Sequence, residues 1–423
     1  MKIWRFAKAL FFPKLVLQLA FAFAFSTAFL SAATSKPSKT IQTAKPPTIR
    51  VLLSQGDKGA LLEARGAFAV FNPENGKKLS SGIKSKRFYL YPHEEGIKWG
   101  EDFPGIFQLQ IVPTEPTTTF LIDGIQYRGA IEVYHIENTL SIINEVDVET
   151  FLKATLTEKV SPELLQPVLN AIAIIARTNT YYTALLNHAS FYHLKAEDID
   201  YHGIGLTKQN LAIEQAIEST RHLIMTYRHQ PFPATWTTHC AGKTASYAQI
   251  FRKQTPAPPG VKSPVALNDR SEAHWNFICE AQELAQAVKL NRITSIDLFA
   301  DPESNKVYGL RVRDGNYAQE ISFTELQQII GHQRLKSNDF TVSVQGNLLA
   351  FEGYGEGLGS GLCLYSAAHL STKGDAAPEL LNAFFPHTDL KKMDTYPKTI
   401  ISADHPTFVS PKQREQQHKI LNQ

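Results

Sequence analysis

The chain has 423 residues, of which 43% are hydrophobic and 20% are charged, and its formal net charge is +3. At roughly 150 residues per domain, this length allows two or three domains. The small net charge, and a sequence without Lys/Arg runs interleaved with aromatic residues, exclude a typical nucleic-acid-binding protein. The cysteines Cys240, Cys279 and Cys363 form no CxxC pair, which argues against a zinc knuckle or a disulfide framework and leaves a single disulfide open.

Residues 1–33 have the pattern of a secretory signal peptide. Basic residues between Lys2 and Lys14 form the leader, residues 15–33 are uncharged, and Ser31-Ala32-Ala33 supplies the small residues of a cleavage site. An uncleaved anchor is the alternative, because the apolar run approaches the roughly 20 residues that span a bilayer. Either interpretation predicts a periplasmic or cell-envelope protein that meets the membrane only through this segment.

A β-rich part is expected to follow a flexible linker. The linker prediction covers residues 34–48, which are rich in Ser, Thr, Lys and Pro. Asp123-Gly124 is typical of a hairpin turn. Apolar and alternating stretches give the strand candidates 49–53, 68–71, 107–112, 120–122, 125–128, 129–136 and 140–148.

Helical patterns take over after this part. Ser161-Pro162-Glu163 is typical of a helix start, and Pro167 predicts that the long helix begins there and ends near Leu186. Shorter helices are expected at 206–221, 281–290 and 323–330, the last between strands of residues 292–352. The order of elements predicts an α+β fold. One domain, or two subdomains, would occupy residues 49–395, and 396–423 would be a polar tail.

The most specific pattern lies in residues 141–180, SIINEVDVETFLKATLTEKVSPELLQPVLNAIAIIARTNT. It resembles the signature of the SpoIID/LytB family, which contains stage II sporulation protein D and amidase-enhancer proteins. There an "IN…L.LE.YL…V…E" segment delivers a Glu to a peptidoglycan glycan strand, and a helix with "A.A..ART" follows. Further family-like segments occur in the family's order: Tyr127-Arg128-Gly129, Thr238 to Thr244, Lys262-Ser263 and the Gly-rich loop Gly357 to Ala367.

The resemblance implies a lytic transglycosylase, which would need one acid/base carboxyl group. An ungapped alignment from Asn144 to Arg177 places Lys159 at the family's Glu position. A one-residue shift across the turn places Glu158 there, and turns absorb such shifts. Glu158 is therefore predicted as the catalytic residue. Leu156 and Val160 are expected to give it apolar surroundings that raise its pKa.

Four residues are predicted to bind the glycan: Arg177, Tyr201, Lys262 and Thr244. Arg177 offers donors for N-acetyl and carboxylate oxygens, with a structural ion pair as its alternative. Tyr201 would stack on a sugar or pack in the core, and Lys262 would contact the glycan or lie on the surface. The rival functions are a non-catalytic glycan-binding activator of a cell-wall amidase and a structural envelope protein.

The Gly-rich loop departs from the family pattern "GHGVGMSQ.GA". Leu358, Cys363 and Leu364 stand where the family has His, Ser and Gln. His239-Cys240 resembles a nucleophile pair, but adjacent side chains rarely converge, and Cys240 is expected to be a buried small residue. Without a His/Cys cluster at ligand spacing, neither a cofactor nor a metal is expected.

Overall fold

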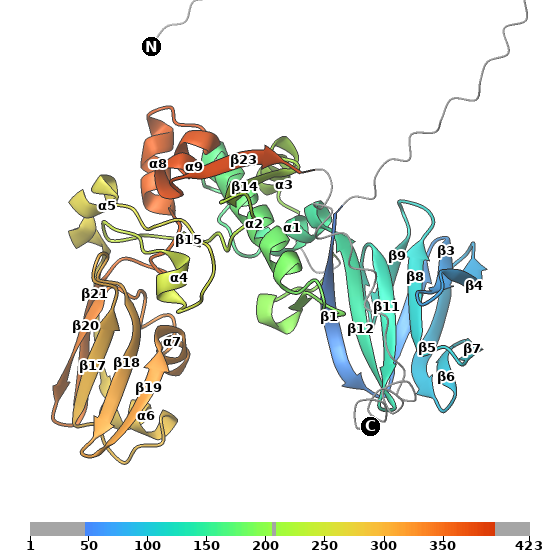
Figure 1. Ribbon diagram of the computed structural model, residues 1–423, viewed down its shortest axis with the longest axis horizontal. Coiled ribbons are helices and arrows are strands. Elements are labelled where there is room, and N and C mark those ends of the chain that lie inside the picture. The colour runs from blue at the N-terminus through green and yellow to red at the C-terminus, as the bar shows by residue number, and fades with distance from the viewer. Residues whose placement is uncertain (1–46, 205–208, 394–423) are drawn as a thin grey trace, which may run out of the picture. The chain divides into compact units, whose positions relative to one another are not determined.

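The computed structural model describes residues 47–204 and 209–393 (Figure 1). The predicted signal peptide, residues 34–46 of the predicted linker, and the polar tail lie outside these ranges. Within them, no helix combines the length and the apolar character that a membrane span requires. Thr48 already belongs to the first strand and pairs with Asp147, so the predicted linker boundary at residue 48 falls inside that strand.

The N-terminal part consists of two β-sheets whose alternating buried residues share one core. Phe68 of the first sheet contacts Trp99 of the second, with ring centroids 5.3 Å apart. The first sheet has the order β13 (Leu194–Lys195), β1 (Thr48–Asp57), β12 (Thr139–Asp147), β11 (Ala130–Ile136), β8 (Gln108–Pro113), β3 (Phe68–Asn72) and β4 (Lys77–Gly82). The second has the order β10 (Ile125–Tyr127), β9 (Thr119–Ile122), β2 (Ala60–Arg65), β5 (Lys86–His93), β6 (Gly96–Trp99) and β7 (Glu101–Pro104).

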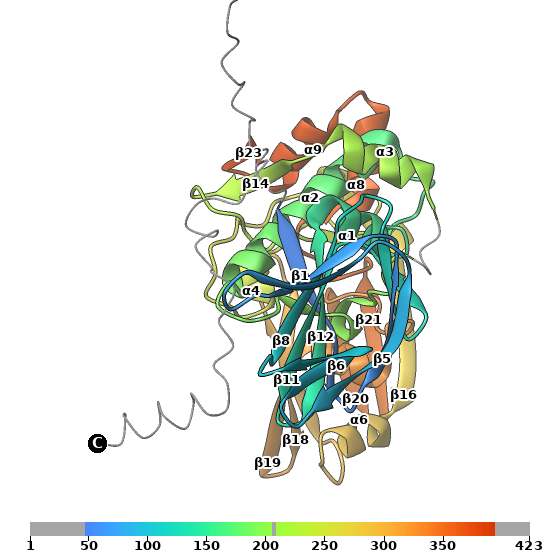
Figure 2. The ribbon, with the colours of Figure 1, turned by 90° about the vertical axis from the view of Figure 1, so that its right-hand side faces the viewer.

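The central helices continue directly from β12 and extend the same core. Asp147 caps the first of them by accepting a hydrogen bond from the Thr150 amide. The helix with Pro167 in its first turn ends at Leu186, as predicted. Figure 2 shows these helices together with a two-stranded sheet. The elements are α1 (Val148–Leu156), α2 (Gln166–Leu186), α3 (Leu211–Ser219), α8 (Leu364–Thr372), α9 (Ala377–Phe384), β14 (Leu223–Tyr227) and β23 (Thr388–Lys392).

Residues 274–354 form a C-terminal module with a second core. The capping box between Ser322 and Glu325 starts its helix at Phe323, and the predicted range 323–330 is confirmed. Its elements are β16 (His274–Glu280), α6 (Ala281–Ala287), β17 (Ser295–Ala300), β18 (Val307–Asp314), β19 (Tyr317–Ser322), α7 (Phe323–Ile330), β20 (Phe340–Gln345) and β21 (Leu348–Tyr354).

Short elements connect the module to the central helices. The β-strands β15 (Trp236–Thr237) and β22 (Leu362–Cys363) pair in parallel, and α4 (Tyr247–Ile250) and α5 (Pro264–Asn268) lie in the chain between them. The predicted α+β class with a β-rich N-terminal part is confirmed.

Candidate functional site

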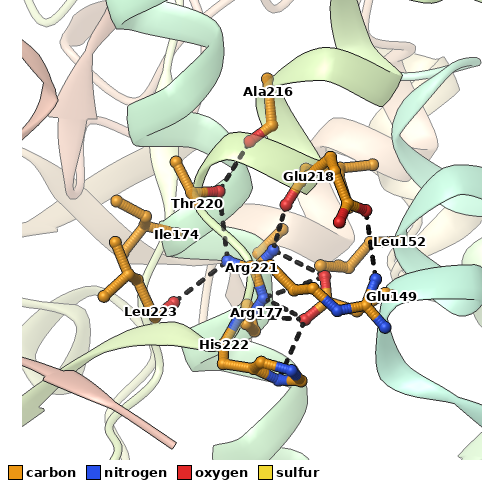
Figure 3. Close-up of polar contacts among 12 residues, drawn as sticks. Glu149, Leu152, Ile174, Arg177, Ala216, Glu218, Thr220, Arg221, His222 and Leu223 are labelled. Carbon is orange, nitrogen blue, oxygen red and sulfur yellow. Dashed lines mark hydrogen bonds and ion pairs between the residues drawn. The ribbon is translucent and has the colours of Figure 1, made fainter. Parts of the chain in front are cut away.

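A buried ion pair joins the two signature helices (Figure 3). Arg177 of α2 has no exposed surface, and its Nη2 atom lies 2.7 Å from Oε2 of Glu149 in the first turn of α1. The Arg177 Nε atom donates to Oε1 of Glu149 at 2.9 Å, so the contact is bidentate. The Glu149 Oε1 atom also accepts from the amide of His222 at 3.2 Å.

The remaining Arg177 donors bind the elements that follow along the chain. Nη2 donates to the Ile217 carbonyl of α3 and Nη1 to the Leu223 carbonyl of β14, each at 3.1 Å. The side chain thus links α1, α2, α3 and β14, and every guanidinium nitrogen is engaged inside the protein. The predicted direct contact of Arg177 with the glycan is corrected here, because the residue is buried and holds the helices together.

Tyr201 is likewise a core residue, with 2% of its surface exposed. Its hydroxyl donates to Oδ1 of Asn144 at 2.7 Å, and its ring packs on Phe151 with centroids 5.7 Å apart. Burial raises the pKa of the Tyr201 hydroxyl well above its usual range. A ring enclosed in this way is not available to stack on a sugar, so that predicted role is also corrected.

Asn144 connects Tyr201 to the family-like Tyr127-Arg128-Gly129 segment. Its Nδ2 atom donates to the Arg128 carbonyl at 2.8 Å and to the Ala130 carbonyl at 3.1 Å. Gly129 has φ +86°, and a Cβ there would lie 2.1 Å from the Glu145 carbonyl oxygen. The "IN" of the signature therefore fixes the turn that precedes β11.

The turn between α1 and α2 presents Glu158 and Lys159 to solvent. The amides of Lys159 and Val160 both donate to the Leu156 carbonyl at 3.0 Å, which fixes the turn. Leu156 and Val160 point into the core beside Leu169. The expectation that they surround the Glu158 carboxyl group is therefore wrong.

Lys159 interacts with the segment that leads to Tyr201. Partial desolvation lowers the pKa of the Lys159 amine, and the nearby Asp200 carboxylate opposes that shift. Lys159 thus places a cation at the family's Glu position in the ungapped alignment.

Thr244 and Lys262 lie close together in a separate loop, where Thr244 pairs with Val261, the residue before Lys262. The Thr244 side chain is buried and accepts from the Val261 amide at 2.9 Å, while Lys262 is exposed. A Cβ on Gly260 would lie 2.0 Å from the Thr244 carbonyl oxygen, which explains why glycine stands at this position. Thr244 thus shapes the loop that presents Lys262, and its predicted direct contact with glycan is corrected.

The predicted site residues fall into two groups. Arg177 and Tyr201 both pack around α1 in the core, whereas Glu158 and Lys262 are exposed on different loops. The sequence reasoning missed Glu149, although its place in the "LE" of the signature pointed to it. Over residues 47–204 and 209–393, no three His, Cys, Asp or Glu side chains gather as metal ligands.

Comparison with known proteins identifies the class to which this arrangement belongs. Residues 136–227 match the family described as SpoIID, Stage II sporulation protein. This match covers the signature strand, α1, α2, α3 and β14, which are the elements that the Arg177–Glu149 pair joins. The chain therefore belongs to the SpoIID family, as a divergent member.

Three relatives illustrate the divergence. An uncharacterized protein of Chlamydia pneumoniae is 37% identical over 185 residues, or 43% of this chain and 67% of the relative. An uncharacterized protein of Chlamydia muridarum is 36% identical over 181 residues, or 42% of this chain and 63% of the relative. Stage II sporulation protein D of Bacillus subtilis is 20% identical over 283 residues, or 63% of this chain and 80% of the relative. The alignments thus span about two thirds of the chlamydial proteins.

Proposed function

We propose that the protein acts on peptidoglycan glycan strands in the cell envelope. SpoIID-family membership indicates a role related to the cell wall. The observation that carries the proposal is the buried Arg177–Glu149 pair, which fixes α1 and α2 so that the turn between them holds Glu158 and Lys159 at the surface. An exposed turn on a rigid base suits a polymeric ligand, because a glycan strand binds along a surface.

The finer activity that we propose is lytic transglycosylation with Glu158 as the acid/base residue. The carboxyl group protonates the glycosidic oxygen that leaves N-acetylmuramic acid. The carboxylate then takes the proton of the sugar's C6 hydroxyl, which closes a 1,6-anhydro ring. One carboxyl group performs both steps, unlike the carboxyl pairs of most glycosidases.

The surroundings of Glu158 set a requirement for this mechanism. A general acid must hold its proton until the substrate is bound, and the removal of water favours the neutral form of a carboxyl group. A bound strand that covers the turn would remove water from Glu158. The proposal therefore assigns that desolvation to the substrate.

A second candidate is a non-catalytic, glycan-binding activator of a cell-wall amidase. The position of Lys159 favours it, since this lysine stands at the family's Glu position in the ungapped alignment. A lysine cannot supply a proton and then act as a carboxylate, but its ammonium can bind the lactyl carboxylate of muramic acid.

The release of anhydro-muropeptides from purified sacculi separates the two functions. We expect Glu158→Gln to reduce release by about 10²- to 10⁴-fold, the usual contribution of a general acid/base. Glu163→Gln, which alters another exposed glutamate of the same connection, is the matched control and should retain activity. Lys159→Ala should retain or increase release, because it removes a charge that stabilises the carboxylate.

Other outcomes select the rival function. If the wild-type protein releases no anhydro sugar and stimulates a partner amidase, the activator function is correct and the transglycosylase function is not. If Lys159→Ala abolishes that stimulation and Glu158→Gln does not, the ungapped alignment identifies the functional residue.

A further inference from the structure

Two cysteines that lie 123 residues apart in the sequence meet in the core. Cys240 follows β15, and Cys363 ends β22, the strand that pairs with β15. The Cys240 amide donates to Sγ of Cys363 at 3.3 Å, which places the two residues side by side. Neither residue has exposed surface, so both sulfurs are held in one enclosed position.

The hydrogen bonds around this pair favour a thiolate on Cys363. The Cys240 amide and the Ser366 hydroxyl both donate to Cys363 Sγ, at 3.3 and 3.5 Å, and the Cys240 side chain lies beside them. The Cys240 side chain and these donors lower the pKa of Cys363, and the neighbouring Cys363 side chain raises the pKa of Cys240. A thiolate is the form that attacks a disulfide, and the second thiol lies within reach.

We propose that Cys240 and Cys363 form a disulfide bond in the exported protein, joining the loop after β15 to the start of α8. Cys363 occupies a position where the family pattern has Ser. A chain with Ser at this position cannot form the bond, so the bond would be a feature of this chain and not of the family pattern. Cys279 lies in the core of the C-terminal module and is expected to remain a thiol. The inference rests on the proposed export, because disulfides persist in oxidising compartments.

The reaction is a thiol–disulfide exchange with an oxidised oxidoreductase or a small-molecule disulfide. During folding, the Cys363 thiolate attacks one sulfur of the oxidant and releases the other as a thiolate, which leaves a mixed disulfide. Cys240 loses its proton and attacks Cys363 Sγ, which expels the second oxidant sulfur. The two cysteines lose two electrons and two protons in total, and the oxidant leaves as a dithiol or as two thiols.

The bond would secure the C-terminal module at both of its connections. Residues 274–354 lie entirely between the two cysteines, so the cross-link closes a chain segment that contains the module. A non-covalent contact already reinforces the same place, since Nζ of the buried Lys306 donates to the Cys240 carbonyl at 2.7 Å and contacts Asp339 at 2.9 Å. Because the loop is long, the bond should restrict the unfolded chain strongly.

Refolding of the full chain in oxidised and reduced glutathione tests the pairing independently of export and of any glycan activity. We expect alkylation and non-reducing peptide mapping to find a Cys240–Cys363 cross-link and a free Cys279. The Cys279→Ser variant should form the same cross-link. Three alkylated cysteines in the refolded wild type, or a bond that includes Cys279, would overturn the proposal.

Thermal unfolding with and without a thiol reductant supplies a second readout, because each protein is compared with itself. A thiol reductant should lower the Tm of wild type and of Cys279→Ser by several degrees. Loss of a cross-link over a long loop lowers the free energy of unfolding. The reductant should leave the Tm of Cys363→Ser unchanged. An equal effect of the reductant on all three proteins would contradict the bond.

Discussion

At the scale of single residues, the Arg177–Glu149 pair shows how the signature serves the fold. A buried charge is costly to remove from water, and a pair offsets that cost only when hydrogen bonds satisfy its remaining donors and acceptors. Carbonyls of α3 and β14 meet this condition for Arg177. The pair therefore determines which elements can pack around α1.

Removal of one partner should be more harmful than removal of both. We expect Arg177→Met to lower the free energy of unfolding by about 3–5 kcal/mol, because it leaves the Glu149 carboxylate buried without its cation. The double variant Arg177→Met/Glu149→Gln should lose less free energy of unfolding than the sum of the losses of Arg177→Met and Glu149→Gln. Urea unfolding of the four proteins measures the coupling energy.

The exposed pair of Arg221 and Glu218, 3.1 Å apart, is the control. Arg221→Ala should cost at most about 1 kcal/mol, as is usual for surface ion pairs. A loss for Arg177→Met as small as that for Arg221→Ala would show that the buried pair does not hold the helices.

The sequence singled out Arg177 and Tyr201 but left open whether they bind glycan or serve the fold, and the structure shows the second role for both. Arg177 meets Glu149 across 28 residues, and the Tyr201 hydroxyl meets Asn144 across 57 residues. A family motif identifies such residues, whereas burial and partners arise only when separate elements pack. The same limit applies to Glu158, whose apolar neighbours in the sequence point into the core.

At the scale of elements, predictions are accurate where local chemistry decides the conformation. The start of α2 lies within one residue of the predicted Pro167, and α7 has the predicted range 323–330, where a Ser322–Glu325 capping box fixes its first turn. The sequence analysis did not predict β2 or the strands from β4 to β7, and in β4 the reason is that the short polar stretch KKLSSG lacks a clear alternation of apolar residues. Pairing with neighbouring strands, not propensity, makes them strands.

The turn before β11 offers a test of backbone fit. Gly129 and Gly124 have φ values of +86° and +90°, but a Cβ would overlap the Glu145 carbonyl oxygen at Gly129 and meet no atom within 4 Å at Gly124. We expect Gly124→Ala to cost about 1–2 kcal/mol from the left-handed backbone alone. Gly129→Ala should cost clearly more, and urea unfolding measures both. Equal losses would mean that the backbone moves aside without cost.

At the scale of the whole molecule, stability depends on how the segment after α2 returns to the first sheet. His193 places its ring against Arg50 of β1, with the Arg50 amide 3.2 Å from Nδ1 and the Arg50 Nη2 atom 3.1 Å from Nε2. Burial and the Arg50 charge lower the pKa of His193 to about 3, while Glu145 acts in the opposite direction. The folded protein therefore holds this histidine neutral.

This arrangement predicts an acid-sensitive fold. The unfolded chain binds a proton at His193 as the pH falls through the ordinary histidine pKa of 6.5, whereas the folded chain does not until about pH 3. Between these values the unfolded state binds more protons, so the free energy of unfolding decreases as the pH falls. One such group contributes at most about 1.4 kcal/mol per pH unit.

Urea midpoints measured at pH 7 and pH 5 should therefore fall more for wild type than for His193→Gln, which cannot take up that proton. His202→Gln removes an exposed histidine from the described segment that follows and should match wild type. The comparison stops at pH 5 because carboxylates begin to titrate below it. If wild type and His193→Gln lose the same stability over this range, the contact between His193 and Arg50 does not control the acid response, and the cause must lie in other buried groups such as His135.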